Sequence, residues 1–272
     1  MLRLPATSSA ALCSDLAHEM NTSAYLSRLG LSNSDVENSV TFLNKLQYAH
    51  VTTIPYENLD ILDGIPISLD PEVMFEKIVT HHRGGYCFEV NGLLSALLLE
   101  LGFDVKNHLA RFLRGENTIP VRRHRVLTVT CTDGRYLCDV GIGQTAPRHP
   151  LKMEAGLVQE QFGEIYKMEW DDFHGWIVYD LHDGEWRKFY SFTEDAQLDV
   201  DFIMPSFYCE KHPNVPFHKD VMVAIKTADG RRALNGRDYK EFVGDTLSYI
   251  EEEISDERRI SLLKEKFGIT WH

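Results

Sequence analysis

The sequence predicts an α+β protein in which helices come first, an antiparallel sheet or barrel follows, and a mixed strand-and-helix segment ends the chain. Three patterns predict this order. Apolar residues recur at helical spacing within residues 22–80, a long apolar helix covers residues 86–101, and strand-like alternation with turn dipeptides begins after Gly102. The 272 residues suffice for one large domain or for two to three small ones packed together.

At the N-terminus, residues 1–19 follow no clear pattern, so we expect an extension rather than a folded element. A signal peptide is the weaker interpretation, because its apolar stretch, residues 10–16, is short and contains polar residues. From Met20 the chain becomes amphipathic. A helix start is expected at residues 34–37, because apolar residues then recur three or four positions apart: Val36, Val40, Leu43 and Leu46.

Two further helices are expected before Gly102. Residues 54–60 are a poor helix opening, because the proline at position 55 biases the residue before it toward extended structure. Residues 71–80 then fit a short helix. After a glycine pair, residues 86–101 form a very apolar helix that closes at Gly102, the usual residue at such a helix end. We expect this helix to be the most buried one.

Beyond Gly102, six segments alternate or carry β-branched and aromatic residues, as strands do: residues 105–114, 125–131, 136–140, 166–170, 176–180 and 185–190. Turn dipeptides lie between several of them: Asp133-Gly134, His174-Gly175 and Asp183-Gly184. From Phe217 onward we expect a strand pair around Asp229-Gly230 and a terminal helix rich in charged residues.

The net charge of −13, from 41 acidic and 28 basic residues, disfavours nucleic acid as a partner. An anionic ligand would need a locally basic site. Five arginines within fifteen residues are candidates, although a solvated loop and strand edge would explain most of them equally well: Arg111, Arg114, Arg122, Arg123 and Arg125. No apolar run approaches the roughly 18 residues of a membrane span, so no membrane association is predicted.

The five cysteines are scattered: Cys13, Cys87, Cys131, Cys138 and Cys209. Their spacing matches neither a disulfide framework nor a paired zinc motif, so we predict no metal site. A reduced, cytoplasmic protein fits this usage.

One cysteine is placed for chemistry. Cys87 follows the Gly84-Gly85 pair and lies in the first turn of the buried helix. There, free backbone N–H groups and the positive helix end stabilise a thiolate and can hold the oxyanion formed when an acyl group is attacked. For an isolated cysteine, a buried structural role would be the better interpretation.

A thiolate nucleophile needs a histidine base and a group that orients it. His124 opens one predicted strand and Asp139 lies on the next. If the turn is centred on Asp133-Gly134, Asp139 pairs with Thr128, about 13 Å along the strand from His124. A turn centred one residue earlier reduces this offset to about 7 Å, and a bulge would act similarly. Taken singly, a surface histidine and a turn-flanking aspartate are the simpler interpretations.

Several motifs together resemble those of the arylamine N-acetyltransferases. They are Ile54-Pro55-Tyr56-Glu57-Asn58-Leu59, the segment from Arg83 through Cys87 to Gly92, His124, Asp139-Val140-Gly141-Ile142-Gly143, Phe189-Tyr190-Ser191-Phe192-Thr193 and His212-Pro213-Asn214-Val215-Pro216-Phe217. The similarity covers nearly everything after Met20. It implies an N-terminal helical bundle (20–104), a central antiparallel β-barrel (105–206) and a C-terminal α/β lid (207–272), with a papain-like or transglutaminase-like catalytic core.

The resemblance also implies a mechanism. A Cys87–His124–Asp139 triad would take acetyl from acetyl-CoA, a cosubstrate rather than a bound cofactor, and pass it from Cys87 to an arylamine or hydrazine in a two-step reaction. An amide synthase or thiol hydrolase with the same triad is the alternative, and a non-enzymatic binding protein is disfavoured because all three residues are present. The preferred acceptor and acyl group, the physiological role and the oligomeric state stay open.

The resemblance assigns further residues by motif position. Tyr56 and Phe112 match the acceptor pocket, with core packing an equal alternative, while Gly141 and Gly143 match the loop beside the coenzyme A phosphates. Lys211 does not match the family's hydroxyl-rich segment, but as a cation it is a candidate contact for a coenzyme A phosphate, which Glu210 would repel. An ion-pair network is expected to hold the nucleophile helix, through Glu57, Arg83 and Glu89. The chain departs from the family pattern on the coenzyme A side at Arg123, Gln144, Glu210 and Lys211.

Overall fold

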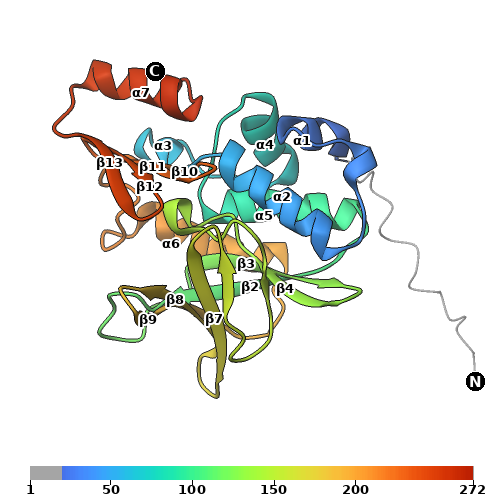
Figure 1. The fold of residues 1–272 in the computed structure, drawn as a ribbon. Helices are drawn as coiled ribbons and strands as arrows, with labels where there is room; N and C mark the ends of the chain where they lie inside the picture. Colours follow the sequence, from blue (N-terminus) through green and yellow to red (C-terminus); the bar gives the residue numbers. More distant parts are fainter. Residues whose placement is uncertain (1–19, 272) are drawn as a thin grey trace, which may run out of the picture.

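The predicted α+β class is confirmed, with helices, an eight-stranded antiparallel sheet and a second, five-stranded sheet (Figure 1). The computed structural model describes residues 20–271, and the predicted extension, residues 1–19, lies outside this range. Among the described residues, no helix has both the length and the apolar character that crossing a membrane requires. The proposed boundaries of the three parts remain predictions.

The helical part contains five α-helices and two irregular turns. They are α1 (Thr22–Arg28), η1 (Asn33–Asp35), α2 (Val40–Thr53), α3 (Leu59–Leu62), α4 (Pro71–Phe75), the π-helical η2 (Glu76–Thr80) and α5 (Cys87–Glu100). Helix α5 is buried along most of its length, as predicted, and ends at Gly102, whose φ is +82°. A single hydrophobic cluster joins α1, α2 and α5 to the barrel, which fixes α5 against the strands.

The helix start expected at residues 34–37 is wrong. Asp35 instead closes a short 3-10 turn, where its carboxylate accepts a hydrogen bond from the Ser32 N–H at 2.9 Å. Helix α2 begins five residues later, because the Ser39 hydroxyl caps it by accepting from the Phe42 N–H at 3.3 Å.

The eight-stranded sheet has the order β5-β4-β3-β2-β9-β8-β7-β6. All six predicted strands are confirmed: β2 (Asp104–Phe112), β3 (His124–Cys131), β4 (Gly134–Cys138), β7 (Glu164–Asp171), β8 (Gly175–His182) and β9 (Glu185–Phe192). Two short strands add to them, β5 (Leu151–Lys152) and β6 (Gln159–Gln161). The Asp183-Gly184 turn forms as expected, with φ of +51° and +78°.

The hairpin of β3 and β4 turns one residue earlier than its Asp133-Gly134 signal indicates. Cys131 pairs with Gly134, and Leu127 pairs with Cys138. Continuing this register would place Asp139 opposite Val126, two residues from His124. The shorter of the two offsets considered for the triad is therefore the one that forms.

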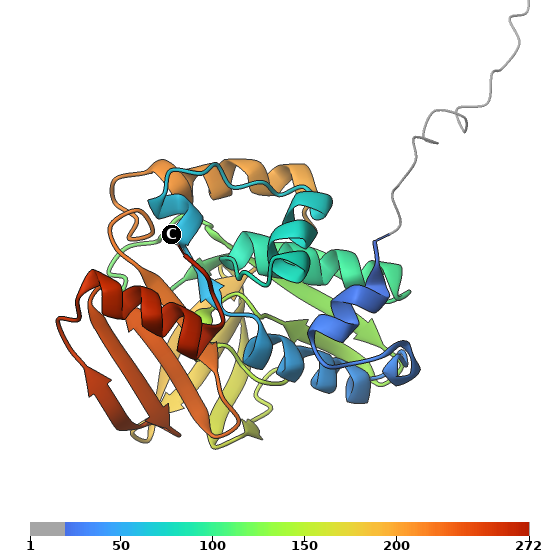
Figure 2. The same cartoon turned by 90° about the horizontal axis from the view of Figure 1, so that it is seen from above.

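The C-terminal part is larger than the expected strand pair. It contains η4 (Asp199–Phe202), α6 (Ile203–Lys211), β10 (Met222–Lys226), β11 (Gly230–Asn235), β12 (Asp238–Val243), β13 (Thr246–Glu251) and α7 (Asp256–Phe267). Its sheet has the order β1-β10-β11-β12-β13 and borrows β1 (Tyr56–Glu57) from the helical part. Helix α7 packs across this sheet through its own apolar cluster (Figure 2). Strand β13 is an edge strand whose residues are almost all exposed, among them the apolar Leu247, Tyr249 and Ile250.

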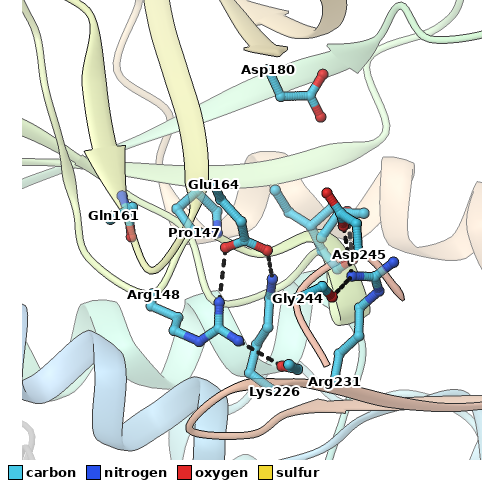
Figure 3. A network of polar contacts seen from close by, with 12 residues as sticks. Pro147, Arg148, Gln161, Glu164, Asp180, Lys226, Arg231, Gly244 and Asp245 are labelled. Atoms are coloured by element: carbon cyan, nitrogen blue, oxygen red, sulfur yellow. Dashed lines mark hydrogen bonds and ion pairs between the residues drawn. The ribbon is translucent and has the colours of Figure 1, made fainter. Parts of the chain in front are cut away.

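A buried network of charges joins the C-terminal sheet to the barrel (Figure 3). Glu164 of β7 accepts from Arg148 Nη1 at 2.9 Å and from Lys226 of β10. Arg148 also donates to the backbone carbonyls of Thr227 and Gly230, at 3.1 and 2.6 Å. This network ties the β10–β11 hairpin to the barrel.

Candidate active site

Cys87 is the first residue of α5, as the sequence predicted, and the glycine pair before it is required by close packing. Gly85 donates to Pro55 O at 3.3 Å and accepts from Glu57 N at 3.0 Å. A Cβ on Gly84 would lie 2.0 Å from Pro55 O, a distance that no side chain permits. The glycines therefore let the loop before α5 pair with the segment that carries Tyr56.

The expected ion-pair network around the nucleophile helix forms, with two additional members. Arg83 bonds Glu57 at 3.0 Å and Asp60 at 2.8 Å, while Lys77 bonds Asp60 at 2.8 Å and Glu89 at 2.7 Å. Glu89 also accepts from the backbone N–H of Tyr86, the residue that caps α5, at 3.1 Å. Arg83 and Glu89 are thus linked through Asp60 and Lys77 rather than directly.

His124 and Asp139 meet in a fully buried pair. The Nε2 atom of His124 lies 2.6 Å from Asp139 Oδ2, so this nitrogen is the donor and Nδ1 is left as the acceptor. Within residues 20–271, Nδ1 is buried without a hydrogen-bond partner. The imidazole packs against the rings of Phe112 and Tyr190, with centroids 4.9 and 5.6 Å away. This is the arrangement of a general base whose second nitrogen is held by a carboxylate.

Asn91 organises this pair, a role that the sequence analysis missed. Its amide Nδ2 donates to Asp139 Oδ1 at 2.9 Å and to Arg125 O at 2.6 Å, and its Oδ1 accepts from Val140 N at 2.9 Å. A signal was available, because Asn91 lies four residues after Cys87 and so shares its face of α5. A polar residue there, on a helix this apolar, needs buried partners.

Cys87 sits against the backbone on both sides of His124. Its sulfur lies 4.0 Å from Arg123 O, and the backbone N–H of Arg125 also hydrogen-bonds toward it. Across the site, a Cβ on Gly141 would fall 2.7 Å from Cys87 Cα. Gly141 is therefore a glycine because the strand end packs directly on the start of α5.

The electrostatics oppose a free thiolate. Burial raises the pKa of the Cys87 thiol well above its ordinary value, and the neighbouring Cys209 thiol raises it further. The Arg125 N–H and the Arg123 charge act in the opposite direction. Because these effects disfavour the thiolate, a proton acceptor must act as the sulfur attacks.

A cleft of about 270 Å³ opens on Cys87. Four residues predicted from the sequence line it: Tyr56, Phe112, Gly141 and Gly143. Gly143 has a φ of +63°, and a Cβ there would press on the Tyr56 ring at 3.3 Å. Lys211 is exposed at the end of α6 and does not line the cleft.

The remaining lining residues were not predicted as site residues, although Ile142, Phe189, Pro216 and Phe217 lie within the motifs that carry the resemblance. The remaining residues are Ile142, Gln144, Thr145, Phe189, Pro216, Phe217, Met222, Val223, Ala224 and Asn235, together with Arg123. The last six neutral residues come from the C-terminal part, which therefore covers one side of the cleft.

Comparison with known protein sequences identifies the proteins that this chain resembles. A sequence model of the N-acetyltransferase family matches residues 39–272. The chain is 38% identical over 224 residues to the arylamine N-acetyltransferase of Mycolicibacterium smegmatis, covering 80% of this chain and 81% of that protein. It is 36% identical over 225 residues to the arylamine N-acetyltransferase of Mycobacterium tuberculosis H37Rv, covering 80% and 79%.

Comparison with solved structures points to the same proteins as the sequence comparison. The arylamine N-acetyltransferase of Salmonella typhimurium superposes with a TM-score of 0.87 at 29% identity, covering 91% of this chain and 90% of that one. The Mycobacterium marinum arylamine N-acetyltransferase in complex with CoA gives a TM-score of 0.85 at 32% identity, covering 92% and 93%.

Proposed function

Because the chain belongs to the arylamine N-acetyltransferases, a family of acyltransferases, we propose that it moves an acetyl group from acetyl-CoA to an arylamine or hydrazine through Cys87. The observation that carries this proposal is the buried Nδ1 of His124, which has no partner among the described residues, together with the cleft that Cys87 lines. The chemistry divides into two half-reactions that use the same three side chains.

In the first half-reaction, His124 Nδ1 takes the Cys87 proton as the sulfur attacks the thioester carbonyl. Asp139, bonded at 2.6 Å to Nε2, stabilises the imidazolium that results. Backbone N–H groups at the start of α5 face the developing oxyanion, where the positive helix end adds to their effect. When the tetrahedral intermediate collapses, His124 returns the proton to the departing coenzyme A thiol, which leaves Cys87 acetylated.

In the second half-reaction, an amine attacks the acetyl-Cys87 carbonyl. His124 Nδ1 removes a proton from the attacking nitrogen and gives it to the sulfur as the C–S bond breaks. The products are the acetylated amine and the free Cys87 thiol. Since both steps pass through the same covalent intermediate, ping-pong kinetics are expected.

The C-terminal part covers one side of the cleft, and this supports transfer of the acyl group to an amine over its hydrolysis. Six neutral lining residues from the C-terminal part close one side of it, among them Phe217 and Met222. An apolar wall of this kind favours an aromatic acceptor and limits the access of water to an acyl-enzyme. Contact of Lys211 with coenzyme A phosphates remains a prediction.

The test is to mix the protein with acetyl-CoA without an amine and to weigh the intact chain and its peptides. We expect one acetyl group on the Cys87 peptide, discharged when an arylamine is added. Cys87→Ser should abolish the adduct, whereas Cys131→Ser, which removes another buried thiol, should retain it. Absence of any adduct would exclude acetyl-CoA as the donor, and discharge without added amine would favour the hydrolase alternative.

A further inference from the structure

Arg123 brings the single charge to a cleft whose other described lining residues are neutral. Its side chain is 18% exposed, and its guanidinium lies 5.6 Å from the centroid of the Phe112 ring on the cleft wall. Its backbone carbonyl is 4.0 Å from the Cys87 sulfur. The cleft that Cys87 lines therefore carries a positive charge, in a protein whose net charge is −13.

The charge of the Arg123 guanidinium is less closely paired with carboxylates than the charges of the nearby arginines are. The side chains of Arg114 and Arg125 form direct ion pairs with Asp180 and Asp199, the latter at 2.7 Å. Among the carboxylates of residues 20–271, the Arg123 guanidinium pairs with Glu116 alone, at 3.9 Å, and the Glu116 side chain is itself 37% exposed. The five arginines that the sequence grouped therefore do not form one basic patch, since Arg123 alone among them lines the cleft.

We infer that Arg123 recognises a carboxylate on the acceptor, so that aminobenzoate-type arylamines are preferred over neutral ones. This inference rests on the proposed function. An acceptor whose amine reaches acetyl-Cys87 and whose ring lies along Phe112 would carry its ring substituent to the guanidinium. A planar guanidinium binds a carboxylate through two parallel hydrogen bonds, and stacking on an aromatic ring preorganises it for this contact.

The phosphates of coenzyme A are less well placed to be the anion. A long pantetheine arm separates them from the thioester, whereas Arg123 is adjacent to Cys87. A carboxylate on the acyl group, as in malonyl-CoA, would offer the same chemistry from the donor side. Kinetics of the two half-reactions separate these sources.

The experiment starts from the acetylated enzyme and measures its discharge by 4-aminobenzoate and by the methyl ester of 4-aminobenzoate, which has the same ring and amine but no charge. We expect the acid to react at least tenfold faster than the ester. Arg123→Gln should lower this acid-to-ester ratio roughly tenfold to hundredfold, because a hydrogen-bonded ion pair is lost. Arg122→Gln removes the same charge one residue away, outside the cleft lining, and should leave the ratio unchanged.

A ratio near one in the wild-type protein, or equal effects of the two substitutions, would overturn the inference. A higher KM for acetyl-CoA in Arg123→Gln, with the acid-to-ester ratio unchanged, would also overturn it. The same holds if malonyl-CoA acylates Cys87 faster than acetyl-CoA does while the acid and the ester discharge the enzyme equally fast. If aniline discharges the enzyme but neither probe does, the inference fails and the proposed function stands. If no amine discharges it, the proposed function fails. Because an ester withdraws electrons from the amine more strongly than a carboxylate does, the change in the ratio on substitution decides, not the wild-type ratio alone. If Arg123→Gln does not fold, Arg123→Lys, which keeps the charge but not the planar fork, takes its place, and a ratio unchanged from the wild type would overturn the inference.

Discussion

At the residue scale, the two carboxylate oxygens of Asp139 have separate tasks. Oδ2 binds His124, while Oδ1 accepts from Asn91 Nδ2 and from the Gly141 N–H, both at 2.9 Å. Because Oδ1 is held from two directions, the carboxylate plane is fixed, and with it the orientation of the imidazole. Asn91 is thus a positioning residue that acts through Asp139.

We predict that Asn91→Ala lowers the rate of Cys87 acetylation by about tenfold to hundredfold, since loss of a supporting hydrogen bond misorients the base. The KM for acetyl-CoA should change little, because Asn91 does not line the cleft. Rapid-quench mass spectrometry of the first half-reaction provides both parameters. Asn107→Ala, which removes a partly buried amide bonded to Arg125 and Ser95, is the control. Similar rate losses in both variants would refute the positioning role.

At the element scale, the start of α5 is held in place by ion pairs rather than by its own sequence alone. Glu89 binds the capping residue Tyr86 with one oxygen and Lys77 with the other. Burial raises the pKa of Glu89, and the adjacent Lys77 charge opposes that rise. Lys77 therefore keeps the carboxylate charged where it anchors the first turn of the helix.

Lys77→Met is expected to lower the free energy of unfolding by about 3 kcal/mol or more, because it leaves Glu89 buried without its cation. Urea unfolding at neutral pH measures the change. Lys45→Met is the matched control. Lys45 is 56% exposed and lies 3.8 Å from Asp35, so its loss should change stability by less than about 1 kcal/mol. Equal losses would mean that the Lys77–Glu89 pair does not anchor α5.

At the scale of the whole molecule, the network of Arg148, Glu164 and Lys226 joins the C-terminal sheet to the barrel (Figure 3). The pKa of Lys226 is lowered to about 8, chiefly by burial, while Glu164 partly offsets the effect of burial. The charges of Arg148 and Arg231 lower it further. The cation that binds the C-terminal sheet to the barrel is therefore close to losing its proton at mildly alkaline pH.

The resulting pH dependence has a definite sign. Between about pH 8 and pH 10.5 the folded chain has released a proton that the unfolded chain still holds. Unfolding then takes up a proton, so the contribution of Lys226 to the free energy of unfolding rises with pH. We predict that the stability of the wild type relative to Lys226→Met increases by about 2 kcal/mol from pH 7 to pH 9.5.

Urea unfolding of both proteins at the two pH values tests this prediction, because other titrating groups cancel in the difference. Lys240→Met, which removes a half-exposed lysine 3.9 Å from Asp238, should show no such change. A difference between wild type and Lys226→Met that stays constant with pH would show that Lys226 titrates normally.

The sequence by itself determined the class and the order of the elements, and it predicted a cysteine-based site. Periodicity is a local property, so the change from helical to alternating spacing after Gly102 was visible without a structure. The same holds for Cys87, because a cysteine after two glycines at the start of an apolar helix is a local pattern. Its resemblance to a known family then singled out His124 and Asp139, which no spacing argument established.

Only the tertiary structure decided how these residues meet. The register of β3 and β4 depended on a one-residue shift of a turn, which dipeptide signals do not resolve. Asn91 supports Asp139, and Lys77 anchors Glu89, across gaps in the sequence. Arg123 likewise meets, in the cleft, residues from distant parts of the chain. Such contacts depend on packing, and packing brings together residues whose proximity no local pattern encodes.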